Sequence, residues 1–162
     1  MDLLEVKTRI AKALVESIFR RARYQVSQDR LDATPRLRFG RDNFSPDFEV
    51  RLDADGAHKE FQVVVKYRPH IDQFVSVESQ RGERSIFHMG QRQWPSLCFV
   101  FVTDRPEAGR SCFQAVPIWT YDPGVPCRSV DLADVEELGI FPRNVGDHEE
   151  LARGILGPLS AI

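Results

Sequence analysis

Four polar side chains of the types that bind divalent cations and position water recur at strand spacing in one stretch: Asp47, Glu49, Gln62 and Lys66. Apolar residues occupy every second position over 48–52 and again over 61–67, which is the pattern of strands with one buried face. Asp55-Gly56 between the two runs predicts a two-residue hairpin turn, because glycine tolerates the positive φ that such turns require. The four polar side chains are therefore expected on one face of a β-hairpin.

The same turn predicts how the two strands pair. If Asp55 and Gly56 form the turn, residues 54 and 57 face each other across the hairpin. Glu49 then lies across from Gln62, and Asp47 lies across from Val64. Because Mg²⁺ is commonly held by one or two carboxylates together with water, this face is a candidate catalytic or metal site.

The arrangement resembles the motif of the PD-(D/E)xK nuclease superfamily, which has the restriction-endonuclease-like fold. That motif places Asp after Pro at the start of one strand and Asp/Glu-x-Lys on the next strand. Pro46-Asp47 matches the first part and Lys66 matches the lysine, whereas Val64 stands where the second acid belongs. The resemblance covers roughly residues 1–120 and is that of a divergent member.

This resemblance implies metal-dependent hydrolysis of phosphodiester bonds in nucleic acid. Asp47 and Glu49 would hold Mg²⁺, with Mn²⁺ as a substitute, and the metal would lower the pKa of a bound water and stabilise charge on the phosphate. Asp47, Lys66 and Gln62 would form the catalytic set, with Lys66 orienting the water or the phosphate.

The missing acid at position 64 leaves two interpretations open, beside a third in which the chain is a small α/β interaction domain with no ancestry in nucleases. Glu49, Gln62 or Glu78 could supply the absent oxygen, in which case the chain is a nuclease. Alternatively the acid is lost, and the chain is a non-catalytic module that binds nucleic acid or a protein partner. Glu16 is left out of the site, because it falls about 160° from the centre of the apolar stripe of the first predicted helix.

The expected fold class is α/β, with a central mixed sheet flanked by helices. The resemblance implies an α-β-β-β-α-β-β core, here followed by two short C-terminal helices. A long helix is expected over 3–22 and a short strand over 24–26, with a loop or an irregular edge strand around 37–39 before the hairpin.

The expected elements after the hairpin are a partly helical stretch, two strands and two helices, over 69–96, 97–103, 112–116, 131–138 and 147–156. The strand at 97–103 is an uninterrupted apolar run, which is typical of a strand covered on both faces. Asp147 with Glu150 resembles a capping box and predicts the start of the last helix. Residues 1–121 would form the nuclease-like core, and 122–162 an extension packed on the same domain.

Basic residues are concentrated near the beginning of the chain, although the formal net charge is only −2. Residues 1–41 hold ten Lys/Arg and five Asp/Glu, whereas 122–162 hold three basic and eight acidic residues. Because the planar guanidinium group suits phosphate, the candidate nucleic-acid ligands are Arg36, Arg38, Arg41 and Arg68. The competing interpretation is that the basic residues are solvated charges and, at the end of the first helix, complement its dipole.

Length and composition favour one soluble, cytoplasmic domain, since 162 residues with 42% hydrophobic content suffice for one core. No apolar run reaches the ~18 residues of a membrane span, and the acidic start Met-Asp-Leu-Leu-Glu does not resemble a signal peptide. The cysteines and histidines show no metal-ligand spacing. The resemblance adds a homodimer as an expectation, because nucleases of this size often act as dimers on duplex DNA.

Overall fold

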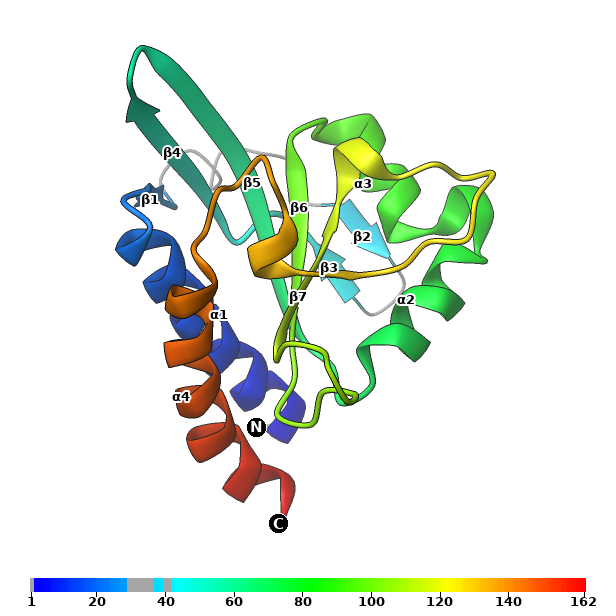
Figure 1. Cartoon of the computed structure of the whole chain (residues 1–162). Coiled ribbons are helices and arrows are strands. Elements are labelled where there is room, and N and C mark those ends of the chain that lie inside the picture. The colour runs from blue at the N-terminus through cyan, green and yellow to red at the C-terminus, as the bar shows by residue number, and fades with distance from the viewer. Residues whose placement is uncertain (1, 29–36, 40–41) are drawn as a thin grey trace.

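A computed structural model describes residues 2–28, 37–39 and 42–162 of the chain (Figure 1). Its centre is a six-stranded mixed sheet with the strand order β1-β4-β5-β6-β7-β8. The strands of this sheet are β1 (Gln25–Ser27), β4 (Phe48–Ala54), β5 (Ala57–Tyr67), β6 (Leu97–Val102), β7 (Phe113–Pro117) and β8 (Val130–Asp131). Strands β5 and β6 are parallel, and every other neighbouring pair is antiparallel.

Four α-helices cover the sheet: α1 (Leu3–Arg21), α2 (Ile71–Ser79), α3 (Ile86–Gln93) and α4 (Pro142–Ser160). Figure 1 shows α1 and α4 side by side on one side of the sheet, and α2 and α3 on the other. Two hydrophobic clusters reflect these layers, since Val63 and Val65 of β5 pack with α1 and α4, while Val64 packs with α2 and α3. The α/β class with a mixed sheet and flanking helices is therefore confirmed.

The predicted hairpin is confirmed, together with its register. Phe48 pairs with Val63, Glu49 with Gln62, and Ala54 with Ala57. Asp55 and Gly56 have φ values of 51° and 77°. Two successive positive φ values are the signature of the type I′ turn, whose twist matches that of the strands.

Strand β6 is buried along its whole length, as its uninterrupted apolar sequence predicted. Cys98, Val100 and Val102 belong to the cluster on the α1 and α4 side. Phe99 and Phe101 belong to the cluster on the other side. The chain reaches β6 from the parallel strand β5 through α2 and α3, as parallel pairing requires a crossover connection.

The prediction of two short C-terminal helices is wrong, because one helix, α4, spans Pro142–Ser160. Proline is favoured in the first helical turn, where its missing N–H costs no hydrogen bond, so the helix begins there and not at the capping-box-like Asp147. Residues 130–134 form the short strand β8 and a single 3₁₀ turn. Val145, Ala152 and Leu156 of α4 are buried, which supplies the packing that outweighs the helix-weakening glycines.

Specific polar contacts join α4 to α1. The Asn144 side chain donates its Nδ2 hydrogen to the Ile18 carbonyl at 2.9 Å. The Nδ1 of His148 lies 2.7 Å from the Asn144 carbonyl, to which it donates, and its Nε2 lies 2.8 Å from the Ser17 hydroxyl oxygen. These contacts fix the end of α4 that lies beside the C-terminal end of α1.

A second, two-stranded sheet pairs β2 (Leu37–Phe39) with β3 (Asp42–Phe44). The expected strand around 37–39 is therefore present, but it pairs with β3 and lies outside the six-stranded sheet. Within the described residues, no helix is long and apolar enough to cross a membrane.

Candidate functional site

Of the four polar residues predicted as a site, Glu49 lies on β4, Gln62 and Lys66 lie on β5, and Asp47 lies directly before β4. Glu49 and Gln62 are direct cross-strand partners, so their side chains project to the same face of the sheet. Val63 and Val65 point to the α1 and α4 side. Because side chains alternate along a strand, Gln62 and Lys66 project to the opposite face, as does Val64.

Asp47 lies directly before β4 and extends the pairing of β4 with β5. Its backbone N–H donates to the Val63 carbonyl at 2.7 Å. Its side-chain Oδ2 accepts the Val65 N–H at 2.7 Å. The carboxylate thus takes the place of the backbone carbonyl that a strand neighbour would offer to Val65. Its other oxygen, Oδ1, lies 2.8 Å from the Nζ of Lys12 on α1. Both carboxylate oxygens are thus bound by groups of the protein itself.

Lys12 is the residue of this site that the sequence analysis missed. The Asp47 side chain is 18% exposed, so the Lys12 ammonium neutralises a carboxylate that is largely removed from water. The sequence offered one signal for Lys12: it lies between Ala11 and Leu14, which are buried, and therefore at the edge of the apolar stripe of α1. That signal does not identify the partner, because the helix and the hairpin meet only in the folded chain.

Glu49 is buried and also paired. Its Oε1 accepts the Nε hydrogen of Arg51 at 3.0 Å, and the same Nε lies 3.5 Å from Glu60. A hydrogen bond from His58, then Glu49 and the charge of Arg51, hold the pKa of the Glu60 carboxyl below its ordinary value. Glu49 therefore belongs to a network of charged side chains on the hairpin.

Lys66 and Arg68 lie at the other end of β5 and are half-buried. Lys66 is paired in register with Phe101 of β6. The Arg68 guanidinium group lies 4.5 Å from the centre of the Phe74 ring and donates to the Tyr67 carbonyl at 2.7 Å. Arg68 thus links β5 to α2, a structural contact that sequence analysis did not predict.

The other predicted nucleic-acid ligands lie in the connection before the hairpin. Arg38 is in β2, where it pairs with Asn43. Arg36 and Arg41 lie outside the described residues.

Two further carboxylates considered from the sequence have other partners. Glu78 is buried and accepts the Ile86 N–H at 2.8 Å, so it satisfies the first turn of α3 and also binds Arg81. Glu16 forms an ion pair with Arg20 at 2.9 Å, one turn along α1. Both observations provide structural roles for these residues.

The donor set does not fit a Mg²⁺ or Mn²⁺ ion. Such an ion needs carboxylate oxygens open to it, whereas Asp47 is bound by Lys12 and Val65, and Glu49 by Arg51. Val64 offers no oxygen. In the described part of the chain, no group of three or more His, Cys, Asp or Glu side chains is placed to hold a metal. The cation beside Asp47 is an ammonium group.

The comparisons with known proteins add no assignment to this geometry. No family model, no curated protein and no solved structure matches the chain.

Proposed function

We propose that the chain is a divergent relative of the PD-(D/E)xK nucleases that binds nucleic acid without cleaving it. The order of elements supports the relationship: a long helix, a short strand, the hairpin, a helical crossover and a buried strand parallel to β5. Pro46-Asp47 before β4 and Lys66 within β5 occupy the motif positions.

The observation that carries the non-catalytic assignment is the pair of contacts made by Asp47. Lys12 Nζ at 2.8 Å and the Val65 N–H at 2.7 Å take up the two oxygens of the motif's first acid. With Val64 in place of the second acid, the positive charge that a metal supplies in a nuclease is supplied here by lysine. A fixed ammonium group neutralises Asp47 but generates no metal-bound hydroxide.

Charge supports nucleic acid as the partner. Because Lys12 neutralises Asp47, the charge of this carboxylate does not repel a phosphate backbone that approaches the hairpin. The excess of basic residues in 1–41 would add attraction of the same, sequence-independent kind.

Fluorescence anisotropy with labelled duplex and single-stranded DNA and RNA in EDTA tests this proposal. We expect metal-independent binding whose logarithmic affinity falls linearly with the logarithm of salt concentration. Lys66→Ala should weaken binding to all sequences alike and reduce the salt slope by about one, whereas Lys66→Arg should retain it. Arg153→Ala, on α4 across the sheet, is the control for loss of one positive charge.

The proposal would be contradicted if the folded protein bound neither duplex nor single-stranded DNA and neither duplex nor single-stranded RNA. So would binding that Lys66→Ala leaves unchanged, since the hairpin face would then not be the contact surface.

A metal-dependent nuclease is the second candidate. The observation that favours it is the register of the hairpin, which places Glu49 across from Gln62 and leaves Asp47 directly before β4. For this activity, the Lys12–Asp47 ion pair would have to open when substrate and metal bind.

A further inference from the structure

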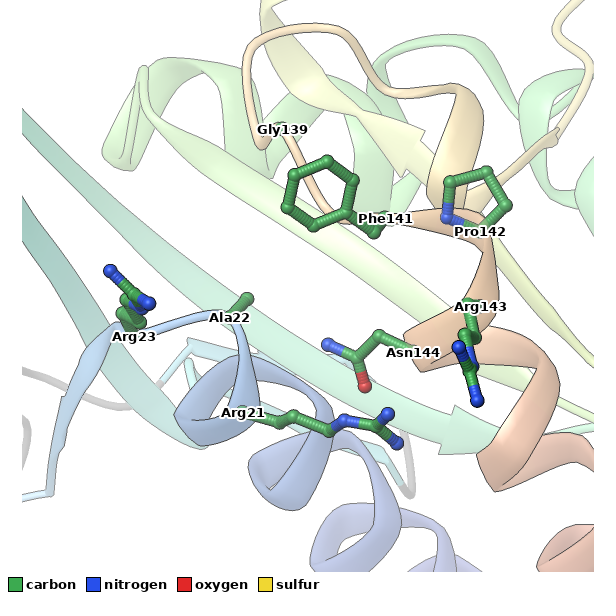
Figure 2. A pocket seen from close by; sticks show the side chains of 8 residues that line it. All are labelled: Arg21, Ala22, Arg23, Gly139, Phe141, Pro142, Arg143 and Asn144. Atoms are coloured by element: carbon green, nitrogen blue, oxygen red, sulfur yellow. The ribbon is translucent and has the colours of Figure 1, made fainter.

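A cavity of about 450 Å³ lies where the C-terminal end of α1 meets the N-terminal end of α4. Its volume is within the usual range of small-molecule sites. Figure 2 shows side chains from both helix ends and from the segment before α4 around it. The Asp47 site contributes no residue to this cavity.

The cavity is positively charged. Three of its lining residues are arginines, Arg21, Arg23 and Arg143, and no acidic side chain is among the described residues that line it. Asp147 pairs with Arg21 at 2.7 Å from outside. Hydrogen bonding from Arg21, and the nearby charge of Arg143, hold the pKa of the Asp147 carboxyl below its ordinary value. The positive end of the α4 dipole adds to this potential.

One buried acceptor in the cavity wall lacks a donor. Asn144 is 6% exposed, and its Oδ1 has no hydrogen-bond partner among the described residues. Exchanging the amide oxygen and nitrogen would not satisfy it, because Nδ2 must face the Ile18 carbonyl. Figure 2 shows the Asn144 carboxamide between the Arg21 side chain and the Phe141 ring. This oxygen is enclosed, so an N–H of a ligand would satisfy it after a small displacement of the side chains around it.

An exposed aromatic ring forms another wall. Phe141 is 77% exposed and lines the cavity together with Ala22 and Gly139. Exposing a phenyl ring to water costs free energy that a bound ligand could recover. The ring also provides a surface on which a planar ring can stack.

We propose that this cavity binds a nucleotide unit. Its base would stack on Phe141 and donate an N–H to Asn144 Oδ1, and its phosphate would be bound by Arg23 and Arg143. The three wall features together match one ligand class, because a nucleotide carries a planar ring, N–H donors and an anion. The unit is either a free nucleotide or the terminal nucleotide of a strand. This inference uses neither Asp47 nor Lys66, although Arg21 and Arg23 belong to the basic excess of residues 1–41.

Arg23 offers a variant that removes a charge without threatening the fold. It has φ of 72° at the end of α1, where Arg23 N–H bonds to Arg20 and Tyr24 N–H bonds to Phe19. Glycine is the residue preferred at this left-handed position of the Schellman motif. Arg23→Gly should therefore keep or raise the melting temperature while removing the guanidinium group.

Isothermal titration calorimetry with AMP tests the inference. We expect saturable binding of AMP and at least ~10-fold weaker binding of adenosine, which lacks the phosphate. Arg23→Gly and Phe141→Ala should each weaken AMP binding roughly 10-fold. Arg92→Ala, an exposed arginine on α3, should bind AMP as the wild type does.

A 5′-phosphorylated oligodeoxyadenylate compared with AMP distinguishes the two sources of the ligand. Tighter binding of the oligonucleotide, lost in Phe141→Ala, assigns the site to a strand end, and tighter binding of AMP assigns it to a free nucleotide. No binding of either, or binding that both cavity variants leave unchanged, overturns the inference. Lys66-dependent binding of nucleic acid would then persist, so this failure is distinct from failure of the proposed function.

Discussion

At the scale of single residues, Asp47 has two partners of unequal importance. The Val65 N–H is buried within the sheet, so no water can replace Asp47 as its acceptor. The Lys12 side chain, by contrast, is 41% exposed. An unsatisfied buried donor costs more than a half-exposed ion pair contributes. Asp47 therefore stabilises the hairpin as well as facing the candidate site.

Substitutions at this pair should separate the two roles. Asp47→Ala leaves the Val65 N–H unsatisfied and should lower the free energy of unfolding by about 2–3 kcal/mol. Lys12→Ala should cost only about 0.5–1 kcal/mol, because the Lys12 side chain is 41% exposed and water can take the place of its ammonium group beside Asp47. Urea denaturation measures both values. Equal losses for the two variants would show that the backbone contact of Asp47 contributes nothing to stability.

Sequence reasoning succeeded for Asp47 only in part, for a physical reason. Alternation and the turn at Asp55 determine which face a strand residue occupies, and those are local properties. The contact with Lys12 joins residues that are far apart in the chain, and neither residue type specifies it. Val64 was recognised as a departure from the motif, but the ammonium group beside Asp47 was not foreseen.

At the scale of elements, the well-predicted segments are those with strong local signals. Helix α1 has a continuous apolar stripe, β4 and β5 alternate around a turn, and β6 is apolar throughout. The two C-terminal helices were predicted wrongly: residues 131–134 form no α-helix, and α4 begins at Pro142 and not at the capping-box-like Asp147. Packing against α1 outweighs that local capping signal. Strand β8 has only two residues, too few for any periodicity.

The junction of β5, β6 and α4 predicts a pH dependence of stability. Burial alone would raise the pKa of the Asp104 carboxyl, but hydrogen bonds from Tyr67, at 2.5 Å, and from Ser160 leave it below its ordinary value. A carboxylate whose pKa is lowered on folding contributes stability above its unfolded pKa, and loses that contribution as the pH falls through the folded pKa.

The wild type should accordingly lose more stability than Asp104→Asn as the pH is lowered from about 5 to about 2. Thermal unfolding of both proteins across this range measures the difference. Parallel pH profiles would show that Asp104 makes no contribution of this kind.

At the scale of the whole molecule, the proposed nucleic-acid contact on the hairpin and the proposed nucleotide cavity lie in different places. Lys66 lies on β5 and Asp47 directly before β4, whereas the nucleotide cavity lies between the ends of α1 and α4. Helix α1 contributes to both, through Lys12 and through Arg21. The protein would thus hold a phosphate backbone and a nucleotide unit by separate groups, without a metal centre.

A cleavage assay tests this account most directly. Supercoiled, linear duplex and single-stranded DNA, and RNA, would be incubated with the protein and Mg²⁺ or Mn²⁺, beside Asp47→Asn, which keeps an oxygen for the Val65 N–H. We predict that the wild type binds these nucleic acids yet yields no more product than the variant or a sample without protein. Metal-dependent cleavage by the wild type that Asp47→Asn abolishes would contradict the account and identify a nuclease whose Lys12–Asp47 pair opens to admit the metal.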